Sequence, residues 1–85
     1  MKILNVDIIT PEEKLFSGEA VSITVPGSGG SFQVLYNHAS LVSTLSKGKI
    51  KVKKQDGVEE VFEASQGICE VNKNKVIVLV EGSIE

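Results

Sequence analysis

Apolar and polar residues alternate in short runs along almost the whole chain, and this period of two constrains the fold more than any other feature. Alternation of this kind indicates half-buried strands. The clearest runs span residues 4–9, 21–25, 32–34, 49–53 and 58–62. Short strands at this spacing predict an all-β fold, a flattened β-sandwich or barrel of about ten strands.

Turn residues separate these runs. Asp56-Gly57 lies between two alternating runs and predicts a hairpin, because glycine accepts the positive φ that a tight turn requires. Residues 72–74, Asn-Lys-Asn, predict a turn in the same way, since asparagine tolerates the left-handed conformation. The other turn signals are Thr10-Pro11, Ser17-Gly18, residues 26–30, Lys47-Gly48 and Gln66-Gly67.

Two segments need a separate interpretation. Residues 76–80 are continuously apolar and mostly β-branched, so they predict a strand that is covered on both faces. Residues 37–45 are the one segment that competes as a helix, because Leu41 and Leu45 stand one helical turn apart. This segment is short for a helix, and its Ser, Thr and Val residues favour a strand. We therefore expect a strand there.

The length of 85 residues allows one domain, which we place over residues 1–85. No apolar run approaches the roughly 18 residues of a membrane span. The N-terminal stretch, with Asn5 and Asp7 among its apolar residues, lacks the core and cleavage site of a secretory signal. The sequence therefore predicts a cytosolic protein that does not insert into a membrane.

The composition argues against several classes of function. The net charge is −2 and there is no arginine, so nucleic acid is not an expected partner. Cys69 is the single cysteine and cannot form an internal disulfide. With His38 as the only histidine, the chain has too few soft ligands for a structural zinc site. We expect neither a metal nor a cofactor.

Candidate catalytic groups are few. The glycine-rich residues 26–30 lack the lysine and the following helix of a phosphate-binding loop, and they predict a turn between strands. His38 and Cys69 are conceivable as a nucleophilic dyad, but no third orienting group accompanies them. Alternation places Cys69 on the same face as Val71, which favours a buried cysteine. We expect no catalytic residue.

Two further surface features have an alternative interpretation. One strand has a basic face, formed by Lys49, Lys51 and Lys53. We interpret this face as a surface exposed to solvent, and the alternative is a binding surface for an acidic partner. Tyr36 is the one candidate for an exposed aromatic platform. Phe16, Phe32 and Phe62 are expected in the core. A free-standing ligand-binding β-sandwich, for sugars as one example, stays open as an alternative function.

Several local runs together resemble one known family. They are residues 8–12 (Ile-Ile-Thr-Pro-Glu), 15–19 (Leu-Phe-Ser-Gly-Glu), 25–27 (Val-Pro-Gly), 37–39 (Asn-His-Ala), 67–71 and 75–79. In this order and spacing the chain resembles the ε subunit of rotary proton-translocating ATP synthases. The resemblance covers nearly the whole chain and implies a flattened β-sandwich at the foot of the central stalk.

The resemblance also implies a function without an active site. In this family the subunit is non-catalytic and belongs to a large hetero-oligomer. It holds the γ subunit and rests on the c-ring, so that torque from proton flow passes into ATP synthesis. The implied location is peripheral, on the cytoplasmic face of the bacterial plasma (inner) membrane.

Two contact surfaces are implied by the matching positions. The γ-facing residues would be Thr10, His38, Ala39, Leu41 and Ser43, and the c-ring-facing residues would be Ser28, Gly29, Gly30 and Ser31. The chain departs from the family pattern at Ser31, Gln33 and Ser40, where an acidic residue, a glycine and a proline are common. Most bacterial members continue into an inhibitory C-terminal helical hairpin. This chain ends at Glu85, where the hairpin would begin. A natural short form and a truncated chain are both open, and the start at Met1 favours the short form.

Overall fold

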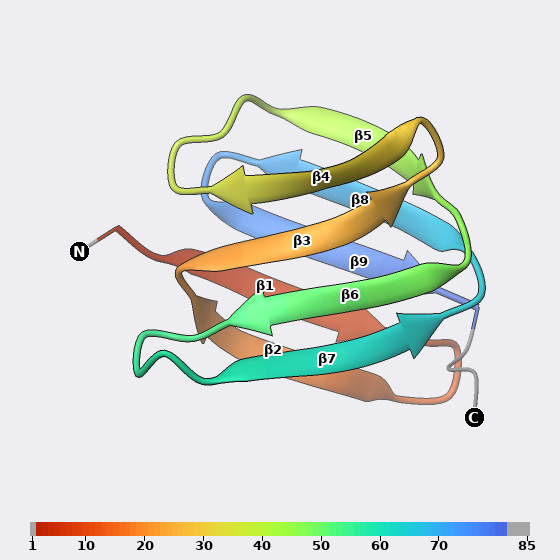
Figure 1. The fold of residues 1–85 in the computed structure, drawn as a ribbon, viewed down its shortest axis with the longest axis horizontal. Helices are drawn as coiled ribbons and strands as arrows, with labels where there is room; N and C mark the ends of the chain where they lie inside the picture. Colours follow the sequence, from red (N-terminus) through yellow and green to blue (C-terminus); the bar gives the residue numbers. More distant parts are fainter. Residues whose placement is uncertain (1, 82–85) are drawn as a thin grey trace.

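The computed structural model describes residues 2–81, which form strands, turns and connecting segments and contain no helix (Figure 1). None of the described residues therefore forms a helix that could cross a membrane. The strands in this part of the chain are β1 (Leu4–Ile9), β2 (Lys14–Ala20), β3 (Ser22–Gly27), β4 (Gly30–Leu35), β5 (Leu41–Leu45), β6 (Gly48–Lys53), β7 (Glu59–Ala64), β8 (Gly67–Asn72) and β9 (Lys75–Val80).

The strands form two layers that share one continuous hydrogen-bonded sheet. One layer has the order β4-β3-β6-β7, and the other has the order β2-β1-β9-β8-β5 (Figure 1). The layers are joined where Gly27 of β3 pairs with Leu45 of β5. All neighbouring strands are antiparallel except β1 and β9. The predicted all-β sandwich is confirmed, with nine strands in the described residues against the ten or so expected.

The core lies between the two layers and follows the alternation read from the sequence. In β1, Leu4, Val6 and Ile8 have at most 1% exposed surface, and the residues between them point outward. In the facing layer, β3 contributes Ile23 and Val25 in the same way. Burial of such side chains stabilises the fold by about 1.5–3 kcal/mol each.

The three phenylalanines lie at the margin of this core. The expectation that they belong to the core is met only in part, because Phe16, Phe32 and Phe62 are partly buried and pack against it. The rings of Phe16 and Phe62 meet edge to face, with their centroids 6.0 Å apart. Because Phe16 belongs to β2 and Phe62 to β7, this contact links the ends of the two layers.

Most of the predicted turns are confirmed, but one is wrong. Gly57 has a φ of 86° in the β6–β7 connection. The turn between β8 and β9 is also present, but its left-handed residue is Lys73, with a φ of 59°, and neither Asn72 nor Asn74 as expected. Ser17-Gly18, predicted as a turn, lies inside β2, where the two residues pair with Asp7 and Val6 of β1. The ladder to β1 continues through the glycine, so the pairing with a neighbouring strand outweighs the local preference of these residues for a turn.

The two segments interpreted separately have different outcomes. Residues 37–45 contain the expected strand, β5, preceded by a turn in which Asn37 has a φ of 65°. The expectation that residues 76–80 are covered on both faces is wrong. Val78 is fully buried, but Leu79 is 49% exposed. In a sandwich of two layers, each sheet has a single buried face, so the second apolar face of β9 lies outside.

Candidate functional site

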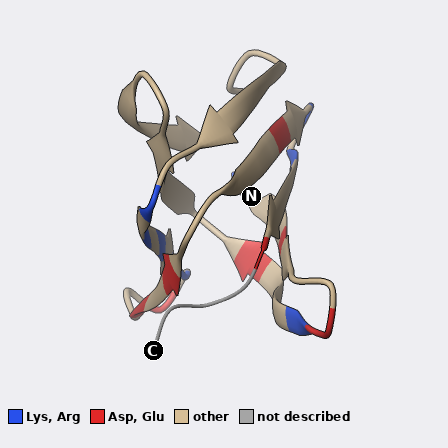
Figure 2. Cartoon of the chain, turned by 90° about the vertical axis from the view of Figure 1, so that its right-hand side faces the viewer, with Lys and Arg blue, Asp and Glu red and all other residues tan. Residues whose placement is uncertain are grey.

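The most distinctive surface feature is a segment without charge. The chain has 9 basic and 11 acidic residues, and none of them lies between positions 21 and 46. This segment forms β3, β4, β5 and their connections. In Figure 2 most of the charged residues lie in the lower half of the molecule, and the upper part is mostly tan, with a red band and blue ends on the strands at the upper right. Its exposed side chains include Leu35 at 51% and Val42 at 70%. Depletion of charge with retained apolar surface is typical of the centre of protein interfaces.

The hairpin between β3 and β4 presents the four residues matched to the c-ring contact. Ser28, Gly29, Gly30 and Ser31 are all exposed, and Gly30 has a φ of 132°, which favours glycine. The Ser28 amide donates to the Thr44 carbonyl at 2.9 Å, and the Thr44 hydroxyl donates to the Ser28 hydroxyl at 2.8 Å. The hairpin tip is therefore held against β5 and offers backbone atoms to the outside.

The loop between β4 and β5 holds His38 at the other end of β4. The Asn37 amide donates to the Asn74 side-chain oxygen at 2.8 Å, and the His38 amide donates to the Leu35 carbonyl at 3.0 Å. The His38 ring lies 2.7 Å, Nδ1 to oxygen, from the Ala39 carbonyl. These bonds fix the loop against the β8–β9 turn, with Ala39 exposed and His38 half-buried.

The predicted γ-facing residues do not form one patch in the structure. Thr10 is only 6% exposed, and its hydroxyl both accepts from the Glu13 amide and donates to the Glu13 carbonyl, at 3.0 Å each. The preceding residue, Ile9, pairs with Leu79 on β9, which pairs with Ile68 on β8, and Ile68 pairs with Thr44 on β5. Thr44 lies at the opposite end of β5 from Leu41. Thr10 therefore lies at the end of the sandwich near the β3–β4 hairpin, away from His38.

On β5 the side chains alternate between the core and the outside. Leu41 and Ser43 stand opposite the buried Val71 and Cys69, and both are half-buried. Val42, between them, is exposed, as is Thr44. The resemblance did not indicate Val42, although alternation from the buried Leu45 would have placed it outside.

A second apolar surface was also missed. Ile9, Leu79 and Ile68 stand side by side on β1, β9 and β8, on the face away from the core. Leu79 is 49% exposed and Ile68 is 44% exposed. The sequence signal was present in the continuous apolar run of β9, whose alternate residues have to face outward in a two-layer fold.

The catalytic alternative has no support in the geometry. Cys69 is fully buried, and burial raises the pKa of its thiol to about 11. A thiol of this kind is neither ionised nor accessible at neutral pH. His38 is held by a backbone carbonyl in its surface loop. Residues 2–81 contain no group of three or more side chains suited to hold a metal ion.

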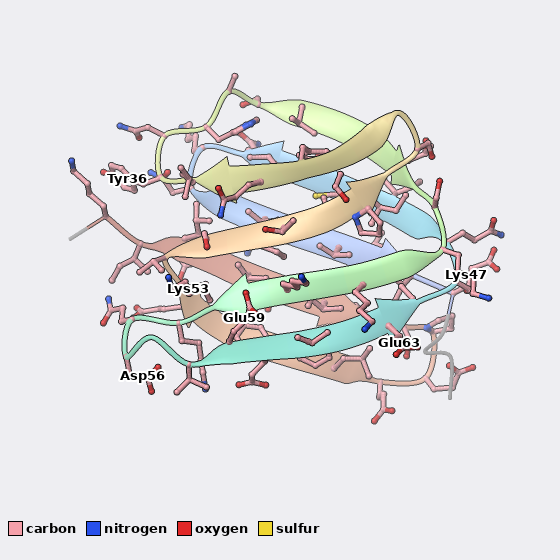
Figure 3. All side chains as sticks on the ribbon, viewed as in Figure 1. Tyr36, Lys47, Lys53, Asp56, Glu59 and Glu63 are labelled. Carbon is pink, nitrogen blue, oxygen red and sulfur yellow. The ribbon has the colours of Figure 1, made fainter. Side chains whose placement is uncertain are left out.

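The basic strand β6 lies beside an acidic strand. Lys49 stands opposite Glu63 and Lys53 opposite Glu59 on β7. Figure 3 shows Lys53 and Glu59 at one end of the strand pair and Glu63 toward the other. The lysines are exposed, in agreement with a solvated face. Tyr36 is 37% exposed, and the one aromatic pair found among the described residues does not include it. Among the described residues, no second aromatic ring therefore stacks beside Tyr36 to form a sugar-binding platform.

Comparison with known proteins gives consistent matches over the whole chain. Residues 3–85 match the family described as "ATP synthase, Delta/Epsilon chain, beta-sandwich domain". The chain is 43% identical over 84 residues to the ATP synthase epsilon chain of Sulfurimonas denitrificans, covering 99% of this chain and 65% of that protein. It is 42% identical over 80 residues to the ATP synthase epsilon chain of Chlorobaculum tepidum, covering 94% and 91%.

Solved structures show the same fold at lower identity. A chain in the cryo-EM structure of the Euglena gracilis mitochondrial ATP synthase, OSCP/F1/c-ring in rotational state 1, superposes with a TM-score of 0.90 at 20% identity, covering 96% of this chain and 52% of that chain. A chain of the Tetrahymena thermophila mitochondrial ATP synthase, central stalk/c-ring, gives a TM-score of 0.77 at 17% identity, covering 96% and 66%.

Proposed function

This chain belongs to the family of ATP synthase delta/epsilon chain β-sandwich domains, and on that premise we propose that it is a non-catalytic subunit of the rotor of a proton-translocating ATP synthase. In this function it binds the γ subunit and the c-ring in the central stalk. It transmits torque between them by its shape and contacts. The location that follows is peripheral, at the cytoplasmic face of the bacterial inner membrane.

One observation supports this proposal more than any other. Eight of the nine residues matched to partner contacts lie in the uncharged segment that forms β3, β4 and β5: Ser28, Gly29, Gly30, Ser31, His38, Ala39, Leu41 and Ser43. All the lysines and acids lie outside this segment. A surface that packs permanently against other subunits benefits from this separation, because buried unpaired charge is costly.

We assign the two ends of β4 to the two partners. The exposed hairpin tip of Ser28, Gly29, Gly30 and Ser31 would meet the c-ring. The loop with His38 and Ala39, continuing to Leu41 and Ser43, would meet γ. Thr10 lies at the hairpin end with its hydroxyl bonded to Glu13, so its contribution to γ binding would come through the position of the β1–β2 turn.

The proposal is tested by equilibrium binding to the γ subunit encoded in the same genome. His38→Glu adds a charge to the uncharged surface, and we expect it to weaken binding about tenfold or more. The matched control is Lys51→Glu, which changes an exposed residue on β6 outside this surface and should leave the affinity within about twofold. Equal affinities of the original protein and both variants, or no binding at all, would reject the proposal.

A further inference from the structure

The sandwich has four edge strands, and they differ in how they are protected against pairing with other chains. The layer β4-β3-β6-β7 ends at β4 and β7. The layer β2-β1-β9-β8-β5 ends at β2 and at β5, although the last residues of β5 pair with β3 and leave only its first part open. An edge strand presents unpaired backbone groups that another strand can join, and charged residues or bulges normally prevent this.

Two of the edges are protected in this way. β7 carries Glu59, Glu60 and Glu63. β2 carries Lys14 and Glu19, and its register with β1 shifts between Ile8 and Ile9. β4 and β5 have no charged residue, no proline and no register shift in their pairing with β3 and β8. The unprotected edges are consecutive in the chain and lie on the same side of the molecule (Figure 1).

The hydrogen bonds of β3 show which backbone groups of β4 are free. The Pro26 carbonyl accepts from the Ser46 amide at 2.8 Å, so Pro26 directs its backbone away from β4. Its partner Ser31 therefore belongs to a pair without mutual hydrogen bonds, and Ser31 directs its own amide and carbonyl to the open edge. By the period of two, Gln33 and Leu35 do the same.

Little in the described chain uses these outward groups. Outside the strand pairs, the backbone hydrogen bonds of residues 2–81 engage one group on this edge, the Leu35 carbonyl, which accepts from the His38 amide. The groups that stay unused lie along an exposed, uncharged strand. They are the amides and carbonyls of Ser31 and Gln33 and the amide of Leu35, whose side chain is 51% exposed beside them.

We propose that an extended, uncharged segment of the γ subunit adds to the open edge of β4 as a further strand, bonding to the outward backbone groups of Ser31, Gln33 and Leu35. The inference rests on the proposed function for the identity of the partner. The edge connects the two proposed contact regions, since β4 runs from the hairpin tip to the His38 loop. An uncharged edge fits an uncharged segment, because a charged one would lose its water without gaining an ion pair.

The test uses a backbone change that leaves the β3–β4 ladder intact. Gln33→Pro removes an amide that points away from β3 and places the proline ring where the added strand would lie. Gln33→Ala is the matched control, because it removes the same side chain and keeps the amide. In equilibrium binding to γ, we expect Gln33→Pro to bind at least about tenfold more weakly than Gln33→Ala.

Hydrogen exchange of the unaltered protein provides a second measurement that does not depend on the folding of the proline variant. The amides of Ser31, Gln33 and Leu35 should exchange slowly in the γ complex and rapidly in the free protein. Equal binding of the two Gln33 variants, or rapid exchange of these amides in the complex, would overturn the inference. Protection in the protein alone, together with a dimer mass in sedimentation, would assign the edge to a second copy and also overturn it.

The outcome also separates this inference from the function on which it rests. If His38→Glu weakens γ binding while the β4 amides still exchange freely in the complex, the strand addition fails and the proposed function stands. If γ does not bind the unaltered protein at all, both fail.

Discussion

Replacing Val78 with aspartate tests the two-layer core. Val78 lies in the middle of β9, has no exposed surface, and stands between Ile8 on β1 and Cys69 on β8. The next residue, Leu79, faces the other side of the sheet and is 49% exposed. Leu79→Asp is therefore a matched control, because it introduces the same side chain one position away on the same strand.

The expected loss of stability has three contributions. Loss of the buried valine side chain costs about 1.5–3 kcal/mol. A neutral carboxyl group without a hydrogen-bond partner costs about 1–3 kcal/mol more. At pH 7 the buried group has to keep its proton about 3 pH units above its ordinary pKa, which adds about 4 kcal/mol. A chain of this length has a total unfolding free energy of about 4–13 kcal/mol, so we expect Val78→Asp to be largely unfolded at pH 7.

The pH dependence identifies the carboxylate as the cause. Burial raises the pKa of the new aspartate in the folded protein above about 3.9, its value in the unfolded chain. Below that value both states are protonated and the third contribution vanishes. The penalty then grows as the pH rises toward the folded-state pKa. Val78→Asp should therefore regain stability between pH 7 and pH 4, measured relative to Val78→Asn, which does not titrate.

Urea unfolding followed by circular dichroism at pH 7 and pH 4 measures these differences. Leu79→Asp should lose about 1 kcal/mol at most, because half of its side chain is already in water. An ordinary unfolding midpoint for Val78→Asp at pH 7, or an equal loss for the two aspartate variants, would refute the placement of Val78 between two layers.

Two further predictions concern single positions in the same layer as β9. At Gly67 an added Cβ would stand 2.1 Å from the Leu79 carbonyl oxygen, so we expect Gly67→Ala to lower the unfolding free energy by about 1–3 kcal/mol. The matched change Gly29→Ala has open space and should alter the thermal midpoint little, so equal midpoints for the two variants would contradict the close approach of β8 to β9. For Cys69, burial and a pKa raised to about 11 predict that a thiol reagent at pH 8 labels it only after unfolding in urea, and rapid stoichiometric labelling of the folded protein would show that the site is open.

The strands could be predicted because a two-layer sandwich imposes one rule on every strand. Each sheet buries a single face, so the alternation in β1 and β3 follows directly from the sequence pattern. The rule failed where a prediction relied on residue type alone. Ser17-Gly18 is a turn by composition, yet its pairing with Asp7 and Val6 continues the strand.

The arrangement of the candidate contact residues could not be predicted in the same way. Whether Thr10 lies near His38 depends on β1 being parallel to β9 and on β5 being antiparallel to β8. These are pairings between strands that are far apart in the sequence, and the local pattern of residues does not contain them. The exposure of Val42, in contrast, requires only alternation along β5.

The absence of charge from residues 21–46 is visible in the sequence, but it acquires meaning through the topology. If β3 lay between charged strands on both sides, charged side chains would flank its uncharged residues, and no continuous uncharged surface would form. Instead β3 pairs with β4 along its whole length and meets β5 at Gly27, and it has a charged neighbour, β6, on one side only. The charged strand β6 pairs with the acidic strand β7, so that Lys49 and Lys53 stand opposite Glu63 and Glu59. The uncharged segment thus forms neighbouring strands, bordered by charged residues on β6 and by Glu70 on β8, and depletion of charge over such a surface is typical of the centre of a protein interface.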